Sequence, residues 1–292
     1  MTFQRTPPRP HFTFAALKTV RSNRLILNAD DFGLHPAVNE AVEQAHREGV
    51  LTAASLMVGA AAAADAIACA RRNPGLRVGL HLVLTDGAAM LPPAEIPDLV
   101  DTHGRFGDRM VRDGIRFYWS AAVRRQLEAE IRAQFAAYAA TGLSLDHVNC
   151  HKHFHLHPTV LDLIIGVGRD YGLKAVRLPL DRRGGWLLRP WLRLLRRRLD
   201  RAGIVHNDQV IGLRNTGKLD EDALLAELEH LAPGVTEIYF HPGTLSGGII
   251  ARTMKGYRHS DELAALLSPL VRAKLDASGL PRGGFSDLAG AR

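Results

Sequence analysis

Short apolar runs alternate along the chain with longer segments in which apolar residues recur every three or four positions. The first pattern predicts buried strands, and the second predicts amphipathic helices. We expect strands at residues 24–28, 51–58, 77–83, 145–150, 174–178, 209–213 and 236–240, and helices at 36–48, 60–72, 120–140, 158–171, 219–231 and 260–278. Strands that alternate with helices in this way are typical of parallel sheets with crossover helices.

This order predicts an α/β protein of about seven strands, arranged as a barrel or as an open, doubly wound sheet. No repeat and no linker divides the chain, so we expect a single domain over residues 24–292, preceded by a poorly ordered basic leader at 1–23. Residues 85–119 are rich in Gly, Pro and Asp, a composition that predicts a long irregular loop or insertion.

Composition narrows the class of protein. The chain has 292 residues, 46% of them hydrophobic, with a net charge of +7, which is compatible with a nucleic acid, a membrane surface or an anionic substrate as partner. Its two cysteines, Cys69 and Cys150, exclude a disulfide framework and a four-cysteine zinc site, and they favour a reduced, cytoplasmic setting. The chain contains no run of eighteen apolar residues, so we expect no segment that spans a bilayer. Residues 1–24 lack the apolar stretch of a secretory signal.

Polar residues of unusual type follow the predicted strands. Five histidines lie within eleven residues, in and directly after the fourth strand: His147, His151, His153, His155 and His157. Asp30 and Asp31 follow the first strand, His81 ends the third, Arg177 ends the fifth, and His241 follows the last. Because the carboxyl ends of parallel strands meet at one edge, we expect these side chains to form one site.

The residue types indicate a mononuclear hydrolytic metal centre. One carboxylate and two imidazoles satisfy a catalytic metal ion that keeps a position open for water. A second carboxylate can then serve as general base. Asp30 and Asp31 can take both roles, because successive residues leaving a strand point to different sides. In an extended segment His151, His153 and His155 would all face the same side, so spacing does not select one of them as ligand.

The same residues carry a family resemblance. The motifs Asn28-Ala-Asp-Asp-Phe-Gly33, Gly79-Leu-His-Leu82, His-x-His-x-His at 151–155, Arg177-Leu-Pro179 and His241-Pro-Gly243 resemble, in this order, those of YdjC-type carbohydrate deacetylases. The overall sequence is similar to the branch of that family associated with hopanoid biosynthesis. The resemblance implies a distorted (β/α) barrel like that of polysaccharide deacetylases, and hydrolysis of an N-acetyl group on an amino sugar with Mg²⁺ or Zn²⁺.

The resemblance also implies roles for single residues. Asp31 and His81 would be metal ligands, with His151 as the third ligand, and Asp30 would be the base that activates water. His241 would protonate the departing amine or hold the intermediate. Arg177 would orient Asp30 or touch the substrate, and His153 and His155 would face the substrate.

A basic segment lies outside these motifs. Eight arginines fall between residues 182 and 201, and from Trp186 onward Leu188, Trp191, Leu192, Leu195 and Leu199 share a helical face. A basic amphipathic helix with tryptophans is typical of contact with a membrane surface, although a helix packed on the barrel gives the same pattern. No recognition fold for nucleic acid is evident. A homodimer is compatible with the sequence.

Three other functions compete with deacetylation of a lipid-linked sugar. The substrate could be a soluble chito-oligosaccharide. An Asp/His site could also hydrolyse phosphoesters, although two-metal phosphatases usually need more carboxylates than this site offers. The third alternative is not an enzyme. The chain could be a metal-binding protein at the membrane surface that catalyses no reaction.

Overall fold

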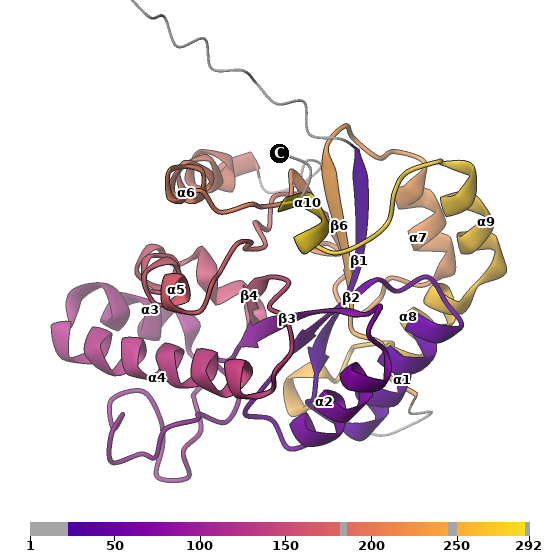
Figure 1. Cartoon of the computed structure of the whole chain (residues 1–292). Helices are drawn as coiled ribbons and strands as arrows, with labels where there is room; N and C mark the ends of the chain where they lie inside the picture. The colour runs from indigo at the N-terminus through magenta and orange to yellow at the C-terminus, as the bar shows by residue number, and fades with distance from the viewer. Residues whose placement is uncertain (1–22, 182–185, 245–249, 290–292) are drawn as a thin grey trace, which may run out of the picture.

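Six parallel strands form one sheet in the order β4-β3-β2-β1-β6-β5 (Figure 1). The computed structural model describes residues 23–181, 186–244 and 250–289. The strands are β1 (Arg24–Phe32), β2 (Ala53–Leu56), β3 (Arg77–Leu82), β4 (Val148–Cys150), β5 (Gln209–Ile211) and β6 (Val235–Phe240). The α/β prediction is therefore confirmed, whereas the expected count of about seven strands is wrong. The predicted leader at 1–23 lies outside the described residues except for residue 23.

The missing strand is the one expected at 174–178. Val176 forms a single parallel bridge to β4, and Ala175 forms another to Val205. The ladder stops there because the backbone N–H of Leu178 donates to the side-chain oxygen of Asn207, at 2.7 Å, and Pro179 follows without a donor. The sheet is consequently a half-barrel, and this irregular segment runs between its edge strands β4 and β5.

Helices cover the outer face of the half-barrel (Figure 1). They are α1 (Pro36–Arg47), α2 (Ala63–Arg72), α3 (Met110–Trp119), α4 (Ala121–Ala140), α5 (Pro158–Asp170), α6 (Arg189–Ala202), α7 (Glu221–Leu228), α8 (His259–Leu267), α9 (Pro269–Ala277) and α10 (Ser286–Ala289), with 3₁₀ turns η1 (His151–Leu156), η2 (Trp186–Leu188) and η3 (Arg252–Met254). The helix predicted at 260–278 is two helices, because Ser268 caps a new helix that begins at Pro269. Within the described ranges, no helix is long and apolar enough to cross a bilayer.

Helix α3 lies inside the segment 85–119, for which an irregular structure was predicted. The prediction is wrong for residues 110–119 because tertiary contacts outweigh a weak helical sequence. Phe117 is buried against Phe154, with ring centroids 5.2 Å apart. Gly114 faces the His157 ring so closely that an added Cβ would lie 3.3 Å from it. A glycine thus lets the helix pack directly on η1, the turn that carries the histidine run.

The sheet is buried on both faces, which explains the nearly continuous apolar runs in its sequence. Ile26 and Leu27 in the central strand β1 are fully buried, as are Val148 in β4 and Ile238 in β6. Asn28 is fully buried in the same strand and is polar. Such a residue needs hydrogen-bonding partners, which the neighbouring strands supply at the site described below.

The amino-terminal end of the half-barrel is closed by a segment distant in sequence. The backbone of Leu25 exchanges hydrogen bonds with residues 281 and 283, at 3.0 and 3.1 Å. Phe285 is fully buried there, and its ring lies 4.9 Å from that of His147. Asp146 accepts from the backbone N–H groups of Phe285 and Ser286, at 3.0 and 2.8 Å. Residues 281–286 therefore form a floor that fixes Asp146 and His147 beneath the site.

Candidate metal centre and active site

Four elements bring carboxylates and imidazoles together at the carboxyl ends of the strands. Asp31 ends β1, His81 lies in β3, His151 follows β4, and His241 follows β6. The Asp31 carboxylate lies 3.3 Å from Nε2 of His81, 3.0 Å from Nδ1 of His151 and 3.9 Å from Nε2 of His241. All four side chains are buried. The residues expected to meet at one edge of the sheet do so.

The backbone of Asp31 places both aspartates on the same cluster. Its φ is +62°, a left-handed value that costs a residue with a side chain about 1–3 kcal/mol. The pairing of β1 with β2 is irregular at this point. The strand alternation predicted to separate the two carboxylates does not hold, since Asp30 lies 3.9 Å from Nδ1 of His81 and Asp31 lies 3.3 Å from Nε2. This strain holds the two carboxylates on one imidazole.

Asn149 determines which nitrogen of His81 carries the proton. Its side-chain N–H₂ group donates to Asp30, at 3.1 Å, and to Ser55, at 2.9 Å. The reverse amide orientation would set its oxygen against the Asp30 carboxylate, so the amide oxygen faces Nδ1 of His81, at 2.6 Å. Nδ1 is thus the donor, and Nε2 keeps its lone pair.

Ser55 connects Asn149 to His147, which in turn contacts Asp146. Its Oγ accepts from Asn28 and Asn149, both at 2.9 Å, and therefore uses its one hydrogen to donate to Nε2 of His147, at 3.0 Å. Nδ1 of His147 then donates to Asp146, at 2.9 Å. Gly79 makes room for that ring, because a Cβ there would lie 2.5 Å from it.

The chemistry of the cluster fits a divalent cation. Asp31, His81 and His151 each offer one ligand atom, and these atoms lie within 4.8 Å of one another. The lone pair of His81 Nε2 faces a carboxylate oxygen of Asp31. Two such electron-pair donors repel each other, and a cation bound between them would make the contact favourable. The second oxygen of Asp31 is buried and has no hydrogen-bond partner among the described residues. One oxygen and two nitrogen donors suit Zn²⁺ and related ions. These three candidate ligands are the ones that the family resemblance implies.

The histidine run is a turn rather than an extended segment. Lys152 and His153 have φ values of +53° and +55°. The prediction that the side chains at 151, 153 and 155 all face the same side is therefore wrong. His151 points to Asp31. His153 contacts the hydroxyl of Tyr239, at 3.3 Å, and burial lowers its pKa well below the usual value. His155 is buried, and burial lowers its pKa to about 3.

Arg177 lies between Asp30 and Glu237 and is fully buried. Its guanidinium donates to both oxygens of Asp30, at 2.6 and 2.9 Å, and to both oxygens of Glu237, at 2.9 and 2.6 Å. Burial would raise the pKa of Asp30, yet the charge of Arg177 and the hydrogen bonds that Arg177 donates hold it far below its usual range. Asp30 is therefore an ionised carboxylate in a fixed orientation.

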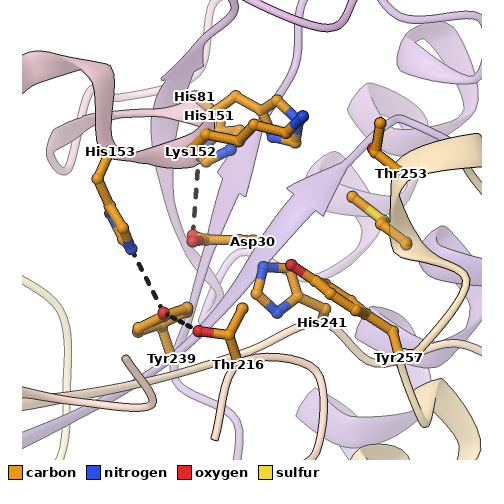
Figure 2. A pocket seen from close by; sticks show the side chains of 11 residues that line it. Asp30, His81, His151, Lys152, His153, Thr216, Tyr239, His241, Thr253 and Tyr257 are labelled. Atoms are coloured by element: carbon orange, nitrogen blue, oxygen red, sulfur yellow. Dashed lines mark hydrogen bonds and ion pairs between the residues drawn. The ribbon is translucent and has the colours of Figure 1, made fainter. Parts of the chain in front are cut away.

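Several of the side chains described above line a partly open cavity of about 90 Å³ (Figure 2). Its lining residues are Asp30, His81, His151, Lys152, His153, Thr216, Tyr239, His241, Thr253, Met254 and Tyr257. The cavity has room for several water molecules or a small group, because one water molecule needs roughly 10–15 Å³ of such accessible space. Asp31, Arg177 and His155 are not among the described residues that line it.

His241 is held from two sides. Its backbone N–H donates to the buried carboxyl of Glu262, and its ring lies 5.0 Å from that of Tyr257. Burial lowers the pKa of His241, although Asp31 and Asp30 act against that shift. The imidazole is consequently neutral near pH 7, with an N–H to donate and a lone pair to accept.

Several residues of the site were not expected from the sequence. Glu237, which balances Arg177, interrupts the apolar strand β6, and that interruption is a signal for a buried partner. Asn149 and Ser55 carry no such signal. Asp86 lies at the edge of the cavity, where it pairs with Lys152 at 2.7 Å and accepts a hydrogen bond from Thr253. It was not expected because it lies in the segment 85–119, for which the sequence predicts no regular structure.

The fold and the site together define an α/β protein with a candidate metal centre at the carboxyl ends of its strands. The chain belongs to the YdjC-like protein family, whose match covers residues 24–277. A carbohydrate deacetylase of Brevibacillus brevis is 31% identical over 266 residues, which is 91% of this chain and 99% of the relative. A chitooligosaccharide deacetylase of Serratia marcescens is 30% identical over 276 residues, covering 90% and 98%.

A solved structure supports the fold. The crystal structure of an Enterococcus faecalis protein named for cellobiose-phosphate cleavage superposes with a TM-score of 0.74 and 25% sequence identity. The superposition covers 92% of this chain and 99% of that protein. The half-barrel is therefore an architecture shared over nearly the whole length of both chains.

Proposed function

We propose that the chain is a metal-dependent deacetylase that hydrolyses the N-acetyl group of an amino sugar. The observation that carries the proposal is the position of Asp30. It is an ionised carboxylate, fixed by Arg177 and directly beside the candidate ligands Asp31, His81 and His151. The names of the relatives, carbohydrate deacetylase and chitooligosaccharide deacetylase, support the same reaction.

The candidate ligands would hold the metal ion, and Asp30 would act as general base. When bound, a divalent ion lowers the pKa of water and polarises the acetyl carbonyl. Asp30 removes a proton from the attacking water as the new C–O bond forms. It then returns that proton to the nitrogen as the C–N bond breaks, leaving acetate and a free amine.

His241 would hold the tetrahedral intermediate. Its lowered pKa favours a neutral imidazole, which donates an N–H to developing negative charge, over an imidazolium that protonates the amine. Of the two roles expected for Arg177, orientation of Asp30 fits its burial, because the guanidinium does not line the cavity. Figure 2 shows His153, Tyr239 and Thr216 in contact with one another at one side of the cavity. The acetamido group would bind against these three residues.

The finer proposal is that the sugar is lipid-linked, as in an N-acetylglucosaminyl hopanoid, and that the protein works at the inner face of a membrane. The overall likeness of the sequence to the hopanoid-associated branch supports it. The size of the cavity is compatible with it, since only the acetamido group has to enter. A soluble chito-oligosaccharide meets the same requirement.

Acetate release tests both levels of the proposal. The purified protein is incubated with chitobiose and with an N-acetylglucosaminyl lipid, each with and without a chelator. We expect metal-dependent release from at least one of them, and Asp30→Asn should bind metal but lose turnover. No chelator-sensitive release from any N-acetylated sugar would overturn the deacetylase assignment. Release of phosphate from a phosphomonoester under the same conditions would favour the phosphoesterase reading.

A further inference from the structure

One face of α3 exposes large apolar side chains to solvent. Val111 is 81% exposed, Ile115 57%, Tyr118 51% and Trp119 78%. At 3.6 residues per turn these four positions fall within an arc of about 100° on one side of the helix. Exposed apolar residues grouped in this way mark a surface that contacts another partner. We refer to Val111, Ile115, Tyr118 and Trp119 as the α3 face.

The opposite side of α3 is already used by the fold. Phe117 packs on Phe154, at 5.2 Å between ring centroids, and on His157, at 6.1 Å. Phe154 belongs to η1, the turn that also carries His151 and His153. The α3 face is therefore not part of the core of this chain, and it lies on the outer side of the helix that covers the site turn.

Positive charge surrounds the α3 face. Residues 105–125 contain six arginines, at 105, 109, 112, 116, 124 and 125, against two acidic residues, Asp108 and Asp113, which leaves an excess of four. Arg112 and Arg116 share Asp113, at 3.4 and 3.8 Å, and Arg116 also pairs with Asp98, at 3.6 Å. A symmetric dimer through this face would set the same arginines against each other. An anionic surface matches the charge instead.

The physical type of the face matches a lipid bilayer. A basic amphipathic helix with a tryptophan and a tyrosine at one end is suited to lie in the headgroup region, with its apolar side in the acyl chains. The segment expected from the sequence to do this, 186–201, is arranged differently. Leu192, Leu195 and Leu199 of α6 are buried in the core, whereas Leu187 and Leu188, just before the helix, are 72% and 53% exposed. Helix α6 itself therefore offers mainly its arginines.

Helix α6 and helix α3 border the same part of the molecule. The indole N–H of Trp191 in α6 donates to the carbonyl of Leu156 at the end of η1, at 3.0 Å. Helix α5 contacts both α3 and α6, and Figure 1 shows the three on one flank. The apolar α3 face and the basic α6 thus flank the turn that carries His151.

We propose that the α3 face docks on an anionic bilayer and brings η1, with the cavity behind it, to the level of the lipid headgroups. This docking goes beyond the proposed hydrolysis and does not depend on it. A lipid-linked substrate would then reach the cavity without leaving the membrane.

Vesicle binding by the full chain tests the proposal. Vesicles of phosphatidylcholine with phosphatidylglycerol should bind the protein, and vesicles of phosphatidylcholine alone should bind it much less. The double variant Ile115→Glu/Trp119→Glu should lower the partition coefficient by about tenfold or more. Leu270→Glu is the matched control, because Leu270 is 61% exposed on α9, and it should bind like the wild type. The tryptophan fluorescence shift on vesicles should vanish in Trp119→Phe while binding persists.

Three outcomes would overturn the docking proposal. They are no binding of the wild type to anionic vesicles, equal binding of the double variant, and a change from dimer to monomer in the double variant. The last would make the α3 face an interface between two copies. Acetate release from chitobiose should be unchanged in the double variant. Absence of chelator-sensitive acetate release from every N-acetylated sugar in the wild type would refute the deacetylase proposal and leave the vesicle result standing.

Discussion

Replacing Arg177 with Met tests the charge arrangement beneath the site. The guanidinium is fully buried and is the cation between the carboxylates of Asp30 and Glu237. Removing one partner of a buried ion pair costs about 3–5 kcal/mol, since the remaining charge is left without compensation. For a domain of this size, each kcal/mol lowers Tm by about 2–4 °C, so we expect a fall of about 6–20 °C. Turnover should drop by about 10²–10⁴, the usual contribution of a general base.

A second substitution separates stability from catalysis. Glu237→Gln added to Arg177→Met removes one of the two stranded carboxylates, so the double variant should recover about 1–3 kcal/mol relative to the sum of the single changes. Turnover should remain low, because Asp30 still lacks the guanidinium bonds at 2.6 and 2.9 Å. Urea denaturation and acetate release measure the two effects. Strict additivity of the stabilities, or turnover that recovers together with stability, would refute the reasoning.

A matched control shows whether the effect depends on burial. Arg132 in α4 pairs with Asp170 at 2.7 Å, and both side chains are largely exposed. Because water screens such a pair, Arg132→Met should leave Tm and turnover nearly unchanged.

Three further predictions concern other groups. Asn149→Leu removes the partner of His81 Nδ1 and should weaken metal binding about 10–100-fold by calorimetry; unchanged affinity would contradict the role given to Asn149. Burial raises the pKa of Glu262 from 4.5 to about 8 despite two backbone N–H donors. Between these pH values the carboxyl is protonated in the folded state and ionised in the unfolded state. The free energy of unfolding should therefore decrease as the pH rises from 4.5 to 8. Glu262→Gln should flatten that dependence, and an equal slope in both proteins would count against it. Burial also raises the pKa of Cys69 to about 11 and that of Cys150 further, so a thiol reagent at pH 8 should label neither cysteine until the protein is unfolded.

The sequence was sufficient to predict which strand ends meet. The order of strands and helices specifies a parallel sheet, and in a parallel sheet the ends of β1, β3, β4 and β6 lie at one edge. Asp31, His81 and His241 could therefore be brought together from chain order alone. This argument needs only the direction of each strand, which short apolar runs and crossover helices define well.

The choice of His151 could not be made in the same way. It depends on left-handed φ values at Lys152 and His153, which no alternation of residue types announces. Asn149 was missed for a related reason, because it is important only through its position beside His81 in the register of β3 and β4. Register is a property of the assembled sheet. Helix α3 was missed because its contacts with η1, and not its own sequence, stabilise it.

The floor made by residues 281–286 has a consequence for the order in which the site is completed during synthesis. Asp146 leaves the ribosome 139 residues ahead of Phe285, whose backbone it must bind. A nascent chain therefore exposes Asp31, His81 and His151 well before the support beneath Asn149 is in place. Domains generally fold as units when their distant segments become available. We infer that the candidate metal ligands acquire their final geometry only after translation has passed residue 286.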